Sequence, residues 1–402
     1  MSASTASAAK ITCQICGEQC HAIQKHLADA HADWTIERYK REYPDAEVFS
    51  EAAKERLRQN AATRAAMAVA GEGPTGTVVA LPARAAAPAK KPMHELFGFT
   101  DAKGQPVDAA LNARKEPIQV TVLGSTGDDD MVPERDPNYV FDIALTKCAL
   151  MAMELNKPLY FWGYHGTGKT SLVEQICAAT HRPWVRIQHT VNTEESHIIG
   201  QMAARDGSTF FEPGPLALAM RNGWVYCADE YDVAVPSVTA VYQPVLEPGK
   251  PLFIKEAPPE WRVVKPHPNF RIVATGNTNG SGDETGLYQG TQLGNAANYS
   301  RFAITEEVGY MAPKVEATII KAQSQIDMKD AEKLVSYATE IRTAFKSSRI
   351  GTTISPRELI NAAQLGLVMG SDWKAGLKRA FSNRMSRTDR ETAEQLAQRL
   401  FG

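Results

Sequence analysis

The sequence predicts an α/β protein built on a parallel β-sheet with helices on both faces. An all-helical lid follows this core, and a small zinc-binding unit and a flexible linker precede it. Three observations lead to this expectation. From residue 132 onward, short apolar runs alternate with helical patterns, which is typical of parallel sheets. Residues 163–170 match the phosphate-binding pattern GxxxxGK[ST] between an apolar run and a helical pattern. After residue 313 the pattern is helical to the end of the chain.

Changes in composition along the chain indicate six segments. The third is rich in Ala, Gly and Pro and has little to bury, as expected of a linker. The segments are a disordered tail at 1–10, a zinc-finger-like unit with a helix at 11–64, the linker at 65–92, an N-terminal extension at 93–131, the α/β core at 132–312 and the helical lid at 313–402. The candidate strands are residues 118–123 in the extension and 159–162, 184–188, 224–229, 271–275 and 303–309 in the core.

Composition and charge exclude several classes of protein. With 402 residues, 43% hydrophobic and 22% charged, the chain has room for two or three ordinary domains. A formal net charge of -2 argues against strong attraction to nucleic acid or to a membrane surface. No apolar run is long enough to span a membrane, and the polar N-terminus lacks a signal-peptide core, so we expect a cytoplasmic protein. Cys148, Cys177 and Cys227 lie in apolar runs and are expected to be buried thiols.

The loop at residues 163–170, GYHGTGKT, is expected to bind the phosphates of ATP. Glycines permit a tight turn in which backbone N–H groups and the N-terminus of the next helix point at phosphate oxygens. Lys169 would reach the β- and γ-phosphates, and Thr170 would ligate Mg²⁺. For Tyr164 and His165, which occupy variable positions of the pattern, we expect a packing or backbone-shaping role. The nucleotide-binding residues expected in this loop are Gly163, Tyr164, His165, Gly166, Thr167, Gly168, Lys169 and Thr170.

A second phosphate-handling motif follows in the expected chain order. The apolar run at residues 224–228 ends in Asp229 and Glu230. Asp229 would hold the magnesium ion through its water shell, and Glu230 would orient and polarise the attacking water. An apolar run that ends in two acids is commonly a strand with a solvated tip. The phosphate loop upstream favours the catalytic interpretation.

Cysteines and histidines gather near the N-terminus. Cys13, Cys16, His26 and His31 have the spacing C-x2-C-x9-H-x4-H, and the histidines lie on a predicted helix at residues 22–30. This set suits a tetrahedral zinc ion, which would supply much of the stability of so small a unit. The nine-residue spacer is short for a zinc finger, and Cys20 or His21 could replace one of the four ligands.

The segment resembles the Ros/MucR type of bacterial zinc finger, and the likeness continues into the helix WTIERYKREY at residues 34–43. That family binds DNA. One finger in a chain without net positive charge makes a weak electrostatic footprint, so we expect docking of a protein partner or a structural role instead.

Residues 132–402 resemble the CobS-type subunits of aerobic cobaltochelatases, within the MoxR branch of AAA+ ATPases. The resemblance is carried by VPERDPNYVFD, GYHGTGKT, DEYD, PHPNFR and GLYQGTQ. It implies a P-loop AAA+ core and a homo-oligomeric ring, expected to be a hexamer. It also implies a partner with a von Willebrand factor A (VWA) domain, CobT-like, and a large client subunit that inserts cobalt into a corrin precursor.

The AAA+ resemblance assigns three further residues. Asn277 comes just after the strand at residues 271–275 and would align the attacking water as sensor 1. Arg301 would reach the γ-phosphate bound by the neighbouring subunit. Arg357 follows a proline that suits a helix start, and would contact nucleotide from the lid as sensor 2.

Other clients remain open. The zinc unit and the linker are not expected of a biosynthetic cobaltochelatase subunit, so a phage- or mobile-element motor with a different client, or a DNA-associated ATPase, are the alternatives. The glycine-rich stretch 276–290 is expected to be a mobile loop near the site or the ring pore. Residues 200–215 are either an insert that contacts a client or partner, or an ordinary hairpin that packs two phenylalanines.

Overall fold

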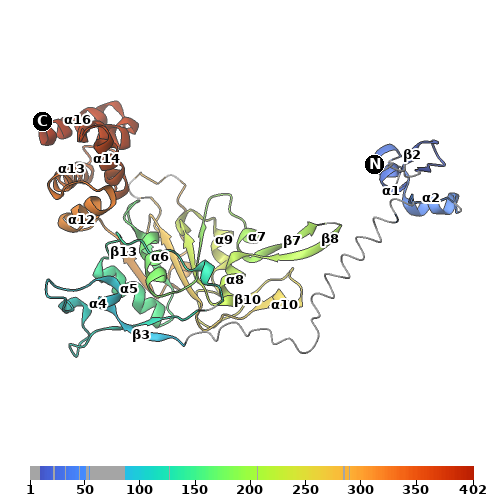
Figure 1. Ribbon diagram of the computed structural model, residues 1–402, viewed down its shortest axis with the longest axis horizontal. Helices are drawn as coiled ribbons and strands as arrows, with labels where there is room; N and C mark the ends of the chain where they lie inside the picture. The colour runs from blue at the N-terminus through green and yellow to red at the C-terminus, as the bar shows by residue number, and fades with distance from the viewer. Residues whose placement is uncertain are drawn as a thin grey trace, which may run out of the picture. The chain divides into compact units, whose positions relative to one another are not determined.

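The computed structural model describes residues 10–20, 23–31, 33–44, 46–50, 54, 87–125, 127–205, 207–283, 286–288 and 290–402. Contacts divide the chain into two units, residues 1–81 and 82–402, which are coloured along the chain in Figure 1. The predicted tail up to residue 9, the alternative ligand His21, most of the helix predicted before residue 64 and the linker up to residue 86 lie outside the described residues.

The first unit is a short hairpin packed on two helices. The hairpin strands are antiparallel, and Thr35 caps the second helix through its side chain. Its small core consists of Ile11, Cys13, Ile23, Leu27 and Tyr39. The elements are β1 (Ile11–Thr12), β2 (Gln19–Cys20), α1 (Ile23–Ala30) and α2 (Ile36–Glu42).

A five-stranded parallel sheet forms the centre of the second unit, and the strands predicted for the core are all present. Their order across the sheet is β13-β5-β12-β9-β6, so β5, β12 and β9 are neighbours in its middle. The strands are β5 (Leu159–Trp162), β6 (Trp184–Gln188), β9 (Val225–Asp229), β12 (Arg271–Gly276) and β13 (Ile304–Glu307).

Alternate residues of these strands enter two separate cores, one on each face of the sheet. Leu159, Phe161 and Cys227 pack with α5 and α6, whereas Tyr160 and Tyr226 pack with α7, α8 and α9. This alternation is what a strand covered on both faces requires. The helices are α5 (Ile143–Glu154), α6 (Lys169–Ala179), α7 (Glu195–Ile199), α8 (Pro215–Asn222) and α9 (Pro236–Val241).

The N-terminal extension folds onto α5. β3 pairs antiparallel with β4, so the last four residues of the segment predicted as linker form a strand. Lys90 and Thr121 of this ribbon both hydrogen-bond the carboxylate of Glu154 at the end of α5. The elements of the extension are β3 (Ala89–Pro92), α4 (Met93–Phe97), η1 (Asp108–Ala110), β4 (Gln119–Val122) and η2 (Asp129–Met131).

Several short elements lie between the strands of the sheet. Residues 200–213 form the hairpin β7–β8, which extends from the core in Figure 1. Of its two phenylalanines, Phe211 packs against Trp261 with tilted rings, and Phe210 stays exposed. The short elements are β7 (Gly200–Arg205), β8 (Ser208–Pro213), η3 (Tyr231–Val233), β10 (Leu252–Phe253), α10 (Pro259–Arg262), β11 (Val263–Val264) and α11 (Ala296–Tyr299).

The C-terminal lid is all-helical, as predicted, and has its own hydrophobic core. Ser355 and Glu358 form a capping box at the start of α14, with a proline at the first helical position. In the parts of the chain that the structure describes, no helix is long and apolar enough to cross a membrane. The lid elements are α12 (Pro313–Ser324), α13 (Met328–Lys346), α14 (Pro356–Val368), α15 (Trp373–Ala380), η4 (Ser382–Arg384) and α16 (Arg387–Phe401).

Candidate functional site

The loop at residues 163–170 joins β5 to α6, so the N-terminus of α6 opens toward it. Two of its glycines are required by their surroundings. Gly163 has φ +137°, and a Cβ there would overlap the carbonyl oxygen of Val308. Gly166 has φ +69°, and a Cβ there would lie 2.6 Å from Cβ of Ser355 in the lid. The loop therefore keeps a bare backbone whose N–H groups can face an anion.

Lys169 is folded against its own loop. Its ammonium group donates to the carbonyl oxygens of Gly163 (2.7 Å) and Tyr164 (2.9 Å) and to Oδ1 of Asn277 (3.3 Å). The side chain is 9% exposed, and burial lowers the pKa of Lys169 to about 8, although three carboxylates nearby act in the opposite direction. A bound phosphate would give this cation the charged partner that the loop carbonyls only approximate.

Asp229 is held by three neighbours at the end of β9. Thr170 donates to its Oδ1 at 2.7 Å, Thr275 donates to the same oxygen, and Arg186 Nε donates to Oδ2 at 2.7 Å. Burial raises the pKa of Asp229, but the two threonine hydroxyls and the Arg186 charge outweigh it, so the net shift is downward. Asp229 is therefore an ionised carboxylate beside Thr170, a pair of oxygen ligands that suits Mg²⁺.

Glu230 adopts a left-handed backbone conformation, with φ +54° and ψ 41°. Such strain in a residue other than glycine is uncommon and often marks a functional site. Asn277 Nδ2 donates to Glu230 Oε2 at 2.7 Å. Burial and the charges of Asp232 and Asp229 raise the pKa of Glu230, which makes its carboxylate a better proton acceptor.

The lid closes over the other side of the phosphate loop. Arg357, at the start of α14, lines one cavity together with Gly166, Thr167 and Gly168. Apolar side chains from three segments complete this cavity, as a purine base needs. These side chains are Tyr139, Val140, Met311, Ile319 and Ile360.

The variable residues of the loop make packing contacts, as expected. The rings of Tyr164 and Tyr310 are stacked at 5.4 Å with an interplanar angle of 3°. The backbone N–H of His165 donates to the hydroxyl of Tyr288 at 3.0 Å, so the predicted loop 276–290 lies beside the phosphate loop. Thr167 Oγ1 donates to the carbonyl oxygen of Tyr164 at 2.8 Å.

Arg301 makes its contacts with residues outside the phosphate loop. Its Nε donates to Glu247 Oε1 at 3.3 Å and its Nη1 to the carbonyl oxygen of Ala297. Among the described residues, no hydrogen bond or ion pair connects it to the phosphate loop.

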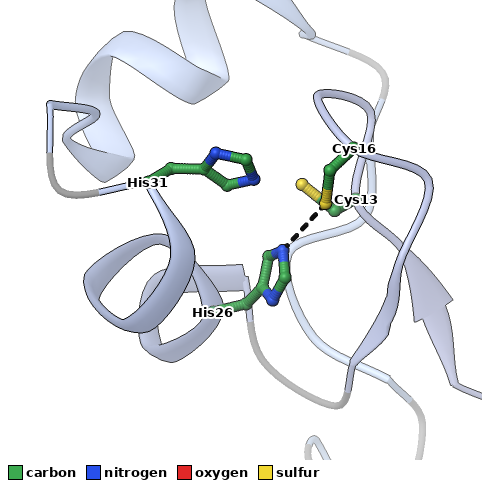
Figure 2. A group of neighbouring side chains, drawn as sticks. All are labelled: Cys13, Cys16, His26 and His31. Atoms are coloured by element: carbon green, nitrogen blue, oxygen red, sulfur yellow. Dashed lines mark hydrogen bonds between the residues drawn. The ribbon is translucent and has the colours of Figure 1, made fainter.

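The first unit brings Cys13, Cys16, His26 and His31 together. One ligand atom from each residue lies within 4.8 Å of all the others, and Cys16 Sγ lies 3.2 Å from His26 Nε2 (Figure 2). Figure 2 shows both histidine rings turned toward the two sulfurs. His31 Nε2 is buried without a hydrogen-bond partner, an unfavourable state that a metal ion would relieve. Cys20 on β2 is not part of this group in the described residues.

Sequence reasoning missed three residues of the ATP site. Arg186 and Thr275 hold Asp229, and Asp232 binds the backbone around Asn277. Asp232 was visible in the string DEYD, which carried the family resemblance without a role for its last residue. No sequence signal distinguishes Arg186 or Thr275, because their contacts depend on the register of β6 and β12 against β9.

Comparisons with known proteins agree with this geometry. Residues 158–302 match the family described as "AAA domain (dynein-related subfamily)", and residues 316–400 match "CbbQ/NirQ/NorQ C-terminal". The chain is therefore a MoxR-type AAA+ ATPase, an ATP hydrolase that uses ATP with Mg²⁺.

One relative with a named function identifies the family more closely. The chain is 34% identical to the aerobic cobaltochelatase subunit CobS of Sinorhizobium sp over 283 residues, which are 68% of this chain and 84% of that protein. It belongs to the CobS family. Midasin of Dictyostelium discoideum is 31% identical over 159 residues, which are 39% of this chain and 2% of that protein.

Two solved structures match more distantly. The RuvB Holliday junction branch migration motor of Thermotoga maritima matches with a TM-score of 0.38 and 16% identity, over 66% of this chain and 72% of that one. A putative ATPase from Cytophaga hutchinsonii matches with a TM-score of 0.35 and 14% identity, over 68% and 92%.

Proposed function

We propose that this protein is a ring-forming ATPase subunit that couples ATP hydrolysis to the remodelling of a partner complex, as in cobaltochelatase. The observation that carries the proposal is the set of groups gathered around one loop. Lys169, Asp229, Glu230 and Asn277 lie at or just after the carboxyl ends of three neighbouring strands and meet at the phosphate loop, and Arg357 faces it from the lid.

Each of these groups has a distinct task in the proposed reaction. The loop backbone and Lys169 bind the phosphates. Glu230 accepts the proton of the attacking water, and Asn277 fixes the carboxylate that does so. Mg²⁺, held by Thr170 and Asp229, would neutralise charge on the phosphate oxygens when bound. Arg357 connects the nucleotide to the lid, so hydrolysis would cause the lid to move.

Arg301 completes the site of the next subunit. Its side chain lies apart from its own phosphate loop, and an arginine added from a neighbour stabilises the charge that develops on the transferred phosphoryl group. Head-to-tail contacts of this kind close into a ring. We propose a hexamer, with a VWA-domain protein and a large client subunit as partners.

Reconstitution tests the assignment to cobaltochelatase. The chain would replace the CobS protein in a mixture of the large subunit, the VWA-domain subunit, Co²⁺, ATP and the corrin precursor. Cobalt insertion, followed by the absorption change of the corrin, is expected with the wild-type chain and is expected to be lost with Glu230→Gln. ATP hydrolysis without cobalt insertion would show that the motor serves another client.

A second candidate function follows from the first unit. The relative named CobS aligns with 68% of this chain, and neither matched family reaches residues 1–157. A motor with an additional N-terminal unit suits a different client, such as a phage or stress complex. Genes for the large chelatase subunit next to this one would favour cobalt insertion, and phage structural or replication genes would favour the second candidate.

Zinc is the ion proposed for the first unit. Two thiolates and two imidazoles are the donor set of a structural zinc site, and this set is present. Elemental analysis of the full chain should find about one zinc per chain, lost on Cys13→Ser with Cys16→Ser. If the metal content is unchanged in this variant, the assignment is wrong.

We propose protein docking or a structural role for the zinc unit rather than DNA recruitment. A titration of the full chain with duplex and single-stranded DNA at physiological salt decides between them. Binding that the cysteine variant loses would establish the DNA-associated alternative.

A further inference from the structure

Asp232 is a buried carboxylate whose contacts reach into the catalytic group. It lies three residues after Asp229 in the short helix η3 and is 2% exposed. Its Oδ2 accepts three hydrogen bonds, from the backbone N–H groups of Asn277 (2.9 Å) and Thr278 (2.8 Å) and from Thr278 Oγ1 (3.0 Å). All three donors belong to the turn that follows β12.

A second side chain, Tyr160, also confines this turn. Gly276 has no room for a side chain, because a Cβ there would overlap the Tyr160 hydroxyl and lie 2.9 Å from Cγ of Asp232. Tyr160 also donates to the carbonyl oxygen of Thr278. The backbone of residues 276–278 is therefore clamped between a tyrosine hydroxyl and a carboxylate, and Asn277 has little freedom to move.

The clamp determines where the Asn277 side chain lies. Its Nδ2 donates to Glu230 Oε2 at 2.7 Å, and its Oδ1 accepts from Lys169 at 3.3 Å. A change in the backbone conformation of this turn would break both contacts at once. A displacement of 1 Å in such a group can cost about 100-fold in rate.

We infer that Asp232 is a positioning residue for ATP hydrolysis, which holds the backbone of Asn277 so that its amide aligns Glu230 with the attacking water. Asp232 is almost fully buried and would not touch a bound nucleotide. Its carboxylate acts only through Asn277, and this inference rests on the proposed roles of Asn277 and Glu230.

A merely structural role makes a different prediction. A buried, hydrogen-bonded carboxylate can serve stability alone, through the three bonds that Asp232 Oδ2 accepts. If stability were its only task, Asp232→Asn would lower the melting temperature and leave kcat of the folded protein unchanged. Its effect would also be independent of Asn277.

A double-mutant cycle separates the two roles. Asp232→Asn keeps the size of the side chain but weakens the three bonds, because a neutral amide oxygen replaces a charged acceptor. We expect kcat to fall about tenfold or more with KM for ATP within threefold, as for a group that acts in the transition state. In an Asn277→Ala background the same change should cost less than about twofold, because there is no amide left to position.

Matched controls make each outcome decisive. Thr278→Val removes one of the three donors but keeps both backbone N–H groups, so kcat should stay within about threefold. A wild-type kcat in Asp232→Asn, an equal loss in both backgrounds, or an equal loss in Thr278→Val would each overturn the inference.

Two further variants in the same assay test the proposed function on which the inference rests. Normal hydrolysis by Glu230→Gln or by Asn277→Ala would remove the proposed role of that residue. The inference about Asp232 fails by itself in a different result: both of these variants are impaired, but the effect of Asp232→Asn is the same with and without Asn277.

Discussion

Replacing Glu230 by Gln tests the proposed chemistry of the site, because it exchanges one carboxylate oxygen for an amide nitrogen. The substitution keeps the size of the side chain, and its carbonyl oxygen can still accept the 2.7 Å hydrogen bond from Asn277 Nδ2. The phosphate loop is untouched, so ATP should bind within about threefold of the wild-type affinity. What is lost is the proton acceptor, whose strength burial and two neighbouring acids increase by raising the pKa of Glu230.

The size of the loss follows from what a positioned base contributes. General-base catalysis supplies about 10²–10⁴-fold, so kcat should fall by this factor, or about 3–5 kcal/mol in the activation free energy. Phosphate release measures kcat, and equilibrium binding of a fluorescent ATP analogue measures affinity. Glu391→Gln in α16 is the control, because it makes the same charge change at an exposed residue. Hydrolysis by Glu230→Gln at the wild-type rate would refute the assignment of the base.

Three further predictions concern binding, lid stability and pH. Lys169→Met should abolish detectable binding of the fluorescent ATP analogue, because it removes the cation that would pair with the phosphates. The melting temperature should stay within a few degrees, since only two loop carbonyls and the Asn277 amide oxygen lose a hydrogen-bond donor. Arg342→Met should lower the free energy of unfolding by about 3–5 kcal/mol, measured by urea denaturation, since it strands the buried Glu316 that it pairs with through two hydrogen bonds of 2.7 Å; Arg399→Met, at an exposed pair, should cost less than about 1 kcal/mol, and equal losses would contradict the reasoning. Burial lowers the pKa of His189, so at low pH the unfolded chain binds a proton that the native protein does not, and stability falls as the pH drops below about 6.5. His189→Gln should therefore reduce the pH dependence of the urea midpoint between pH 6.5 and 5. An unchanged pH dependence would show that this histidine is not responsible.

Much of the core and its site could be predicted because both follow from local patterns. Apolar runs between helical patterns predict parallel strands, and the carboxyl ends of such strands meet at one edge of the sheet. Lys169 follows β5, Asp229 ends β9 and Asn277 follows β12, so their convergence required only that these strands be neighbours. The helical lid was equally clear from its periodicity.

Other features depend on contacts that no local pattern records. β3 was assigned to the linker from the Ala, Gly and Pro composition of residues 65–92, but it pairs with β4, about thirty residues away along the chain. The ion pair between Arg186 and Asp229 depends on the register of two strands. The clamp around Asn277 needs the buried carboxylate of Asp232, whose role appears only once the turn after β12 is in place.

Mixing two inactive variants tests most directly the claim that adjoining subunits build each ATP site together. Arg301→Ala keeps its own base but gives its neighbour no arginine, which should cost about 10³-fold or more in kcat, while Glu230→Gln supplies the arginine but lacks the base. In rings assembled at a one-to-one ratio, about one quarter of the interfaces combine an intact base with an intact arginine, so hydrolysis should rise to roughly that fraction of wild type. No recovery at any ratio, from variants shown to assemble together, would contradict the account.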